Sequence, residues 1–158
     1  MITRWEQGRA TIDAMLLDGE LSTVAPNKEW ASTLIDLAEE HIGAADKIIN
    51  VSALTAFQTY YDAVHKIFDA ILVNQGLRGT GKGGHIALQR AAKAQLVPPL
   101  GDLVDDFHWM RQLRNAGDYP VPDKKLADSE DAVEAQTVAK GLVAKARILI
   151  EQMPAYGS

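Results

Sequence analysis

The side chains with the clearest chemical potential lie in the segment from Arg114 to Tyr119, which reads Arg-Asn-Ala-Gly-Asp-Tyr. Arg114 follows Met110 by four residues, so on a helix it continues the apolar face and not the solvent-facing one. A guanidinium at such a position needs an anion, because an unpaired charge is expensive to bury. On this pattern alone, an internal ion pair with Asp118 or with a carboxylate of another helix is favoured over a bound anionic ligand.

A second group consists of cations without nearby acids. The chain has a formal net charge of −5, yet no acidic residue falls between Asp69 and Asp102, a stretch that holds several cations: Arg78, Lys82, Arg90 and Lys93. The net charge argues against non-specific coating of nucleic acid, whereas a locally basic surface suits an anionic ligand bound at one place. Alternatively, these cations are only solvent-exposed side chains of a loop and a helix and bind no ligand.

The histidines are the third group: His41, His65, His85 and His108. None pairs with another at a spacing typical of a helical metal site, so we expect no metal site and no cofactor. His41 and His65 lie beside apolar stripes, which predicts histidines at the edge of the core. His85 opens a helix directly after flexible glycines, where it can be an N-cap or, alternatively, part of an anion site whose helix terminus lowers the pKa of a histidine.

The segment 76–84 holds five glycines and is predicted to be a mobile loop. Gly76, Gly81 and Lys82 fit the spacing of a phosphate-binding P-loop, but Gly83 stands where Ser or Thr should hold magnesium. The motif also needs a preceding strand, and a long amphipathic helix precedes this segment. A loop whose backbone amides touch an anion is therefore favoured over a P-loop.

Helical periodicity recurs along the chain, and no segment shows sustained strand alternation. An N-terminal helix that ends near Asp18 is expected to carry one apolar face: Ile2, Trp5, Ile12 and Leu16. Further helices are expected over about 28–49, 52–75, 85–95, 100–117 and 129–149, the first of them capped by Asn27. The clearest apolar stripe belongs to the second of these: Leu54, Phe57, Tyr61, Val64, Phe68 and Ile71. The prediction is one all-α domain over 1–158, an up-and-down bundle of about five or six helices, with 1–22 as an N-terminal appendage.

The composition is that of a globular protein, with 47% hydrophobic and 23% charged residues in a chain long enough to bury a core. The absence of cysteine excludes a disulfide framework and a thiolate nucleophile. The N-terminus lacks the pattern of a signal peptide, and no apolar run approaches the roughly 20 residues that span a bilayer. We therefore expect a cytoplasmic protein without a membrane segment.

The segment ending in Arg114-Asn115-x-x-x-Tyr119 resembles the motif of the HEPN family, in which an Arg and a polar residue precede a His four to six residues after that Arg. The long helix around Ala56–Ala63, its continuation into Asn74-Gln75-Gly76-Leu77-Arg78 and the final helix after the Tyr-Pro turn are also similar to these proteins. The likeness covers roughly residues 28–152. Tyr119 occupies the position of the motif His.

The resemblance implies a homodimer in which the motifs face each other across a two-fold axis. It also implies a toxin or phage-defence protein that cleaves RNA without a metal through Arg114, Asn115 and Tyr119. Phosphate or RNA contacts are expected from neighbouring side chains: Arg78, Lys82, His85 and Arg111. A cognate antitoxin, nucleotidyltransferase-like or other, is a further expected partner.

Two alternatives remain open on the sequence. A tyrosine has an unperturbed pKa of about 10, so a phenol at the motif position is as a base about a thousandfold less available at neutral pH than a histidine. The chain can therefore be a non-catalytic HEPN module that binds RNA, a nucleotide or a partner protein. It can also be a dimeric scaffold in which Arg114 makes only an ion pair.

Overall fold

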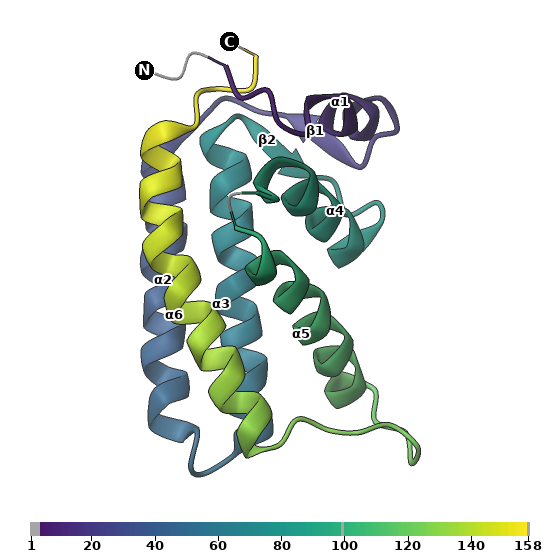
Figure 1. Cartoon of the computed structure of the whole chain (residues 1–158), viewed down its shortest axis with the longest axis vertical. Coiled ribbons are helices and arrows are strands. Elements are labelled where there is room, and N and C mark those ends of the chain that lie inside the picture. Colours follow the sequence, from purple (N-terminus) through teal and green to yellow (C-terminus); the bar gives the residue numbers. More distant parts are fainter. Residues whose placement is uncertain (1–3, 99, 158) are drawn as a thin grey trace.

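The computed structural model of the protein describes residues 4–98 and 100–157, which contain six helices and two short strands (Figure 1). In chain order these are α1 (Arg9–Leu17), β1 (Leu21–Thr23), α2 (Lys28–Ile48), α3 (Ala53–Asn74), β2 (Leu77–Gly79), α4 (Gly84–Leu96), α5 (Asp102–Asp118) and α6 (Ser129–Gln152). The predicted all-α bundle is confirmed. No helix in this described part is both long and apolar enough to cross a membrane.

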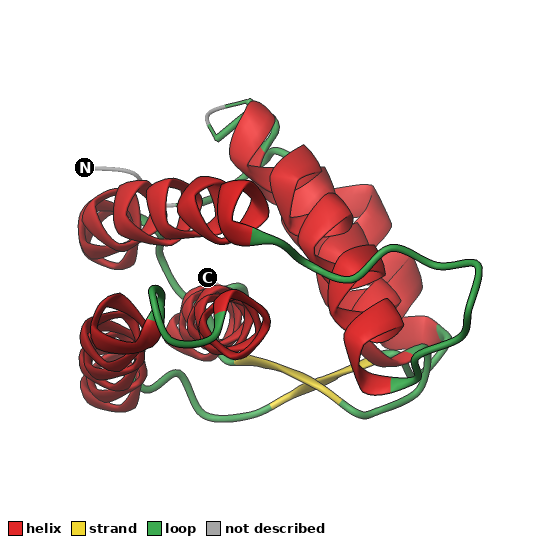
Figure 2. Cartoon of the chain, turned by 90° about the horizontal axis from the view of Figure 1, so that it is seen from below, coloured by secondary structure: helices red, strands yellow, loops and turns green. Residues whose placement is uncertain are grey.

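Helix α3 is the centre of the fold. It packs against α2 and α6, which run alongside it, and against α5, which crosses at an angle on another side (Figures 1 and 2). The predicted apolar stripe of α3 is confirmed, because all of its members except the half-buried Leu54 are buried. Burial of these large side chains is the main favourable contribution to folding here.

Side-chain caps fix where the three long helices begin. The Asn27 side chain accepts a hydrogen bond from the Trp30 N–H at 2.8 Å, as the sequence predicted for this helix start. At the start of α3 the Ser52 hydroxyl oxygen accepts a hydrogen bond from the Thr55 N–H at 3.2 Å. For α6, Asp128 is the cap, and its carboxylate accepts from the N–H of Asp131 in a reciprocal capping box. Each cap satisfies a backbone donor that the helix itself leaves free.

The small sheet was not predicted. β1 pairs antiparallel with β2, with Leu21 opposite Gly79 and Ser22 opposite Arg78, so the first part of the glycine-rich segment is a strand and not a loop. Leu21 and Leu77 are both buried. Strands of three residues are too short to show an alternating pattern, and their pairing joins segments far apart in the chain, which explains the wrong prediction.

The rest of the glycine-rich segment is anchored to the N-terminal part of the chain. The Thr80 hydroxyl donates to the Gly19 carbonyl at 2.5 Å, and the Lys82 ammonium donates to the Asp18 carbonyl at 2.6 Å. We predicted a mobile loop here. Instead, three glycines with positive φ, Gly81, Gly83 and Gly84, turn the chain back into α4 while these bonds hold it in place.

The N-terminal helix is shorter than predicted and starts at Arg9. Trp5 lies before it, and its indole N–H donates to the Gln95 carbonyl of α4 at 3.1 Å. Ile2 lies outside the described residues. The chain turns at Gly8, where φ is 75°, a conformation that glycine adopts without strain.

A pair of glycine substitutions is expected to have opposite effects on stability. A Cβ at Gly8 would lie 2.4 Å from the Ala94 carbonyl carbon, in addition to the positive φ, so Gly8→Ala should lower the free energy of unfolding by roughly 2–4 kcal/mol. Gly43 is helical, and a Cβ there meets nothing within 4 Å, so Gly43→Ala should raise it by about 1 kcal/mol. Urea denaturation of the two variants measures both effects. Equal effects of the two substitutions would contradict the close packing at Gly8.

Candidate active site

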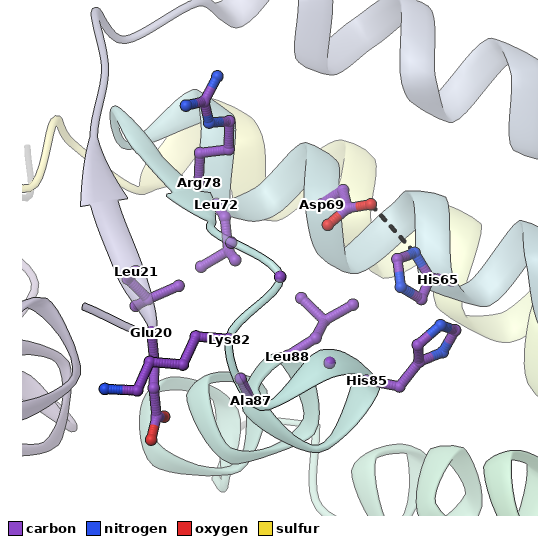
Figure 3. Close-up of a pocket in the computed structure, with 13 residues that line it drawn as sticks. Glu20, Leu21, His65, Asp69, Leu72, Arg78, Lys82, His85, Ala87 and Leu88 are labelled. Atoms are coloured by element: carbon purple, nitrogen blue, oxygen red, sulfur yellow. Dashed lines mark ion pairs between the residues drawn. The ribbon is translucent and has the colours of Figure 1, made fainter. Parts of the chain in front are cut away.

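Four side chains from three helices meet beside α3, and we call them the histidine cluster: Tyr61 and His65 from α3, His85 from α4, and Arg114 from α5. The imidazole centroids of His65 and His85 lie 4.5 Å apart, with the rings tilted by 56°. Figure 3 shows the two rings facing each other across the gap between α3 and α4. The cluster brings together two acid–base groups and a permanent cation.

His65 is held by a carboxylate one helical turn further along α3. Its Nδ1 lies 3.0 Å from Asp69 Oδ2, and both side chains are only partly exposed. This contact fixes the orientation of the imidazole and can balance the charge of its protonated form. The sequence predicted a histidine at the edge of the core, and His65 does lie half-buried there, but it also faces a cavity.

His85 is held by a phenol. The Tyr61 hydroxyl is hydrogen-bonded to His85 Nδ1, and the two rings stack with centroids 5.6 Å apart. Burial, followed by the neighbouring His65 and Arg114, lowers the pKa of His85, so its imidazole is neutral at neutral pH. Burial raises the pKa of Tyr61, and the guanidinium groups of Arg114 and Arg111 oppose this only in part, so the phenol keeps its proton.

His85 does not cap α4, contrary to one of the two predictions for it. The N-cap is Gly83, and His85 is the second residue of the helix. Its side chain turns towards α3 because the glycine-rich turn lets α4 start close to Tyr61. The other prediction was an anion site with a histidine of lowered pKa; the pKa of His85 is lowered, chiefly by burial, and the anion site stays a prediction.

Arg114 makes the predicted ion pair with Asp118, at 3.1 Å, and it also lies over the ring of Tyr61 at 5.4 Å from the centroid. Gln58 of α3 donates to the other oxygen of Asp118 at 3.1 Å, which ties the end of α5 to α3. Close approach is possible because Gly117 has no side chain: a Cβ there would lie 2.9 Å from Gln58 Nε2. The expected ion pair is therefore confirmed, and it holds the guanidinium over the ring of Tyr61, which in turn stacks on His85.

Asn115 and Tyr119, the other two residues of the predicted motif, lie elsewhere in the single chain. Asn115 is exposed and lines an open groove of about 510 Å³ that Trp109 and Lys125 also line. The Tyr119 side chain is 78% exposed. No side-chain hydrogen bond joins Arg114 to either of them in the described part of the chain. Their convergence across a dimer interface stays a prediction.

A cavity of about 320 Å³ opens beside the histidine cluster and is lined by His65, Asp69 and His85 (Figure 3). Of the cations predicted to bind an anion, Arg78 and Lys82 line it. Figure 3 shows the Lys82 amine pointing away from the histidines, where it donates to a backbone carbonyl.

Arg90 of the acid-free segment and Arg111 of α5 already have partners. Arg90 pairs with Glu20 at 3.2 Å, which the folded chain brings from the N-terminal part. Arg111 donates to Gln89 at 3.4 Å and to Nδ1 of His108 at 3.2 Å. A stretch without acids in the sequence therefore does not give an equally basic surface, because Glu20, just before β1, and Asp69 of α3 supply carboxylates.

The chain gave no match to any protein-family model, curated protein or solved structure with which it was compared. Sequence reasoning missed Tyr61 and Asp69 as site residues, although Tyr61, His65 and Asp69 recur at intervals of four on α3 and so share one helix face.

Two histidines in contact, each oriented by a different partner, can serve as one proton acceptor and one proton donor. His85 is available as the acceptor because it is neutral. Which ring nitrogen accepts depends on its tautomer: if Nδ1–H donates to the Tyr61 oxygen, Nε2 is free to accept a proton. Arg114 can bind an anionic group. In the described residues, no group of three or more His, Asp or Glu side chains is arranged as a metal site.

The lowered pKa of His85 predicts a pH dependence of stability. In the unfolded chain His85 takes up a proton at about pH 6.5, whereas in the folded chain it does so only at lower pH. The free energy of unfolding therefore falls as the pH drops below about 6.5, and it stops falling once the pH is below the pKa of His85 in the folded chain. His85→Gln should reduce this pH dependence. Thermal unfolding of both proteins between pH 5 and 7.5 measures it, and identical slopes would count against a neutral, buried His85.

Proposed function

We propose that this chain is an endoribonuclease of the HEPN type, a toxin or defence protein, whose acid–base groups are His85 and His65 and whose phosphate-binding cation is Arg114. The observation that carries the proposal is the contact between the two histidines beside a guanidinium at the edge of an open cavity. In this proposal His85 takes the role that the family motif gives to the residue at the position of Tyr119.

The reaction needs only groups of the chain and the RNA. Neutral His85 accepts the proton of a ribose 2′-hydroxyl, whose oxygen then bonds to the adjacent phosphorus. The bond from phosphorus to the 5′-oxygen of the next nucleotide breaks, and protonated His65 donates a proton to that oxygen. The products are a 2′,3′-cyclic phosphate and a 5′-hydroxyl, and the two histidines exchange protonation states.

Arg114 supports this reaction by charge. Negative charge builds on the phosphoryl oxygens as the 2′-oxygen attacks, and a fixed cation there lowers the barrier. A guanidinium has five N–H donors, and Asp118 binds the Nη1 end at 3.1 Å, so donors remain for a phosphate. Asp118 then acts as a positioning residue for Arg114.

A test of the proposal is cleavage of a single-stranded RNA in the presence of EDTA, with analysis of the new ends. The expected result is cleavage that leaves 2′,3′-cyclic phosphate and 5′-hydroxyl ends. The same RNA with a 2′-deoxyribose at the cleaved position should stay intact at that position. Cleavage of the deoxy substrate at the same bond would overturn the mechanism.

A second candidate function is a non-catalytic HEPN module that binds RNA, a nucleotide or a partner protein such as an antitoxin. The open groove beside Asn115 and the exposed Tyr119 and Val121 near it favour this alternative. A homodimer seated on this surface belongs to either candidate. A sedimentation mass of twice 17.2 kDa is therefore expected of both candidates, and binding of RNA without cleavage would favour the binding module over the enzyme.

A further inference from the structure

A second, smaller cavity of about 180 Å³ adjoins the cavity beside the histidine cluster. The two cavities share part of their lining, namely Asp69, Leu72, Arg78 and Gly79. The smaller one is otherwise apolar, with Trp30, Leu34, Val73 and Leu77 around it. A ligand at the histidines can therefore extend into the smaller cavity past Arg78.

Trp30 gives the smaller cavity an aromatic wall. Its side chain is 48% exposed, although its backbone is fixed by the Asn27 cap at the start of α2. A half-exposed indole beside aliphatic side chains offers a face on which a nucleobase can stack, whatever its identity. The cap fixes the backbone position from which the indole projects.

Arg78 lies between the two cavities and is exposed. Its backbone is held by the pairing of β2 with Ser22 of β1. In the part of the chain that the structure describes, its guanidinium makes no ion pair, unlike Arg90 and Arg114. Asp69 nearby is already engaged with His65 at 3.0 Å. Arg78 is thus free to bind a phosphate through two parallel N–H bonds.

We propose that the smaller cavity binds a nucleobase of single-stranded RNA, stacked on Trp30, while Arg78 binds the phosphate that links this nucleotide to the one at the histidines. This inference rests on the proposed ribonuclease function and names its substrate class. His65 lines the larger cavity and Val73 lines the smaller one. Because these two residues are eight positions apart on α3, the route between the cavities is about 12 Å long, which a short oligonucleotide can span. Bases in a duplex are stacked on each other and cannot occupy the cavity.

The test is the affinity of a short fluorescent single-stranded RNA whose cleavable position carries 2′-deoxyribose, measured by anisotropy. Trp30→Ala should weaken binding by about 5- to 150-fold, the range for loss of one stacked base. Trp30→Phe should keep most of the affinity, and Arg78→Ala should weaken binding and reduce its salt dependence. Ile148→Ala, an exposed apolar residue on α6, is the matched control and should change nothing.

The outcomes separate this inference from the proposed function. If RNA binding depends on Trp30 but the all-ribose RNA is not cleaved, the base subsite is supported and the proposed ribonuclease function is overturned. Cleavage by the wild type with unchanged affinity and rate in Trp30→Ala overturns the subsite and leaves the ribonuclease. Equal affinity for single-stranded and duplex RNA would also overturn the base subsite. So would a shift from dimer to monomer in Trp30→Ala, because a second copy of the chain would then cover this face.

Discussion

Replacement of His85 by alanine is expected to reduce the rate of RNA cleavage by about 10²- to 10⁴-fold, the usual contribution of a general base. His85 is the group whose environment keeps it neutral at physiological pH, because burial and the adjacent His65 and Arg114 lower its pKa. The measurement is kcat on a defined oligonucleotide at several pH values. The rate of the wild type should fall towards acid pH as His85 takes up a proton.

Tyr119→Phe is the matched control for this prediction. Its hydroxyl is in solvent and makes no hydrogen bond that the structure describes, so we expect an unchanged rate. The reverse result, loss of cleavage in Tyr119→Phe with normal activity in His85→Ala, would assign the base to the Arg-Asn-x-x-x-Tyr motif across a dimer interface. Tyr61→Phe tests the positioning of His85, and it should shift the acid limb of the pH profile as well as lower the rate.

Arg114→Ala is expected to lower kcat by about 10²- to 10³-fold, with a smaller effect on the affinity for RNA, because the cation acts mainly on charge that develops in the transition state. Arg114→Lys should recover only part of the rate, since an ammonium cannot keep the Asp118 contact and bind a phosphate in the same plane. Single-turnover kinetics with the three proteins measure this step directly.

Asp118→Asn separates the two roles of Arg114. If Arg114 binds the scissile phosphate, loss of the Asp118 charge should alter its position and lower the rate moderately while the guanidinium remains. If Arg114 is only a structural ion pair, Arg114→Ala and Asp118→Asn should lower thermal stability to a similar extent and leave any cleavage unchanged. That pattern would remove Arg114 from the site.

The parts of the fold that the sequence predicted are those governed by local periodicity. The apolar stripe of α3 and the cap at Asn27 depend on residues a few positions apart, so both were found. The β1–β2 pairing joins segments more than fifty residues apart in the chain through two buried leucines, and no local pattern marks it. The start of α1 at Arg9 was missed because Trp5 mimics a helical position while it bonds to α4.

The candidate site divides in the same way. The ion pair of Arg114 with Asp118 is an i, i+4 pair and was predicted from spacing. The partnership of His65 with His85 depends on how α4 docks on α3, which is set by the glycine-rich turn and the small sheet. Tyr119 follows the end of α5 at Asp118 and is exposed in the single chain, so its convergence with Arg114 across a dimer interface stays a prediction.

The small sheet also determines how the chain can be shortened or extended. Glu20 and Leu21 line the cavity and β1 covers the edge of β2, so a version that starts at residue 24 would keep the three long helices but open one wall. It would also expose an unpaired strand edge, which invites association between copies. Tyr156 donates its backbone N–H to the Gln75 carbonyl, and its own carbonyl accepts from Arg9 at 2.8 Å. Arg9 just after Gly8 and Tyr156 after α6 are therefore tied to each other and to the end of α3 at Gln75, so removal of either residue would loosen the same end of the bundle.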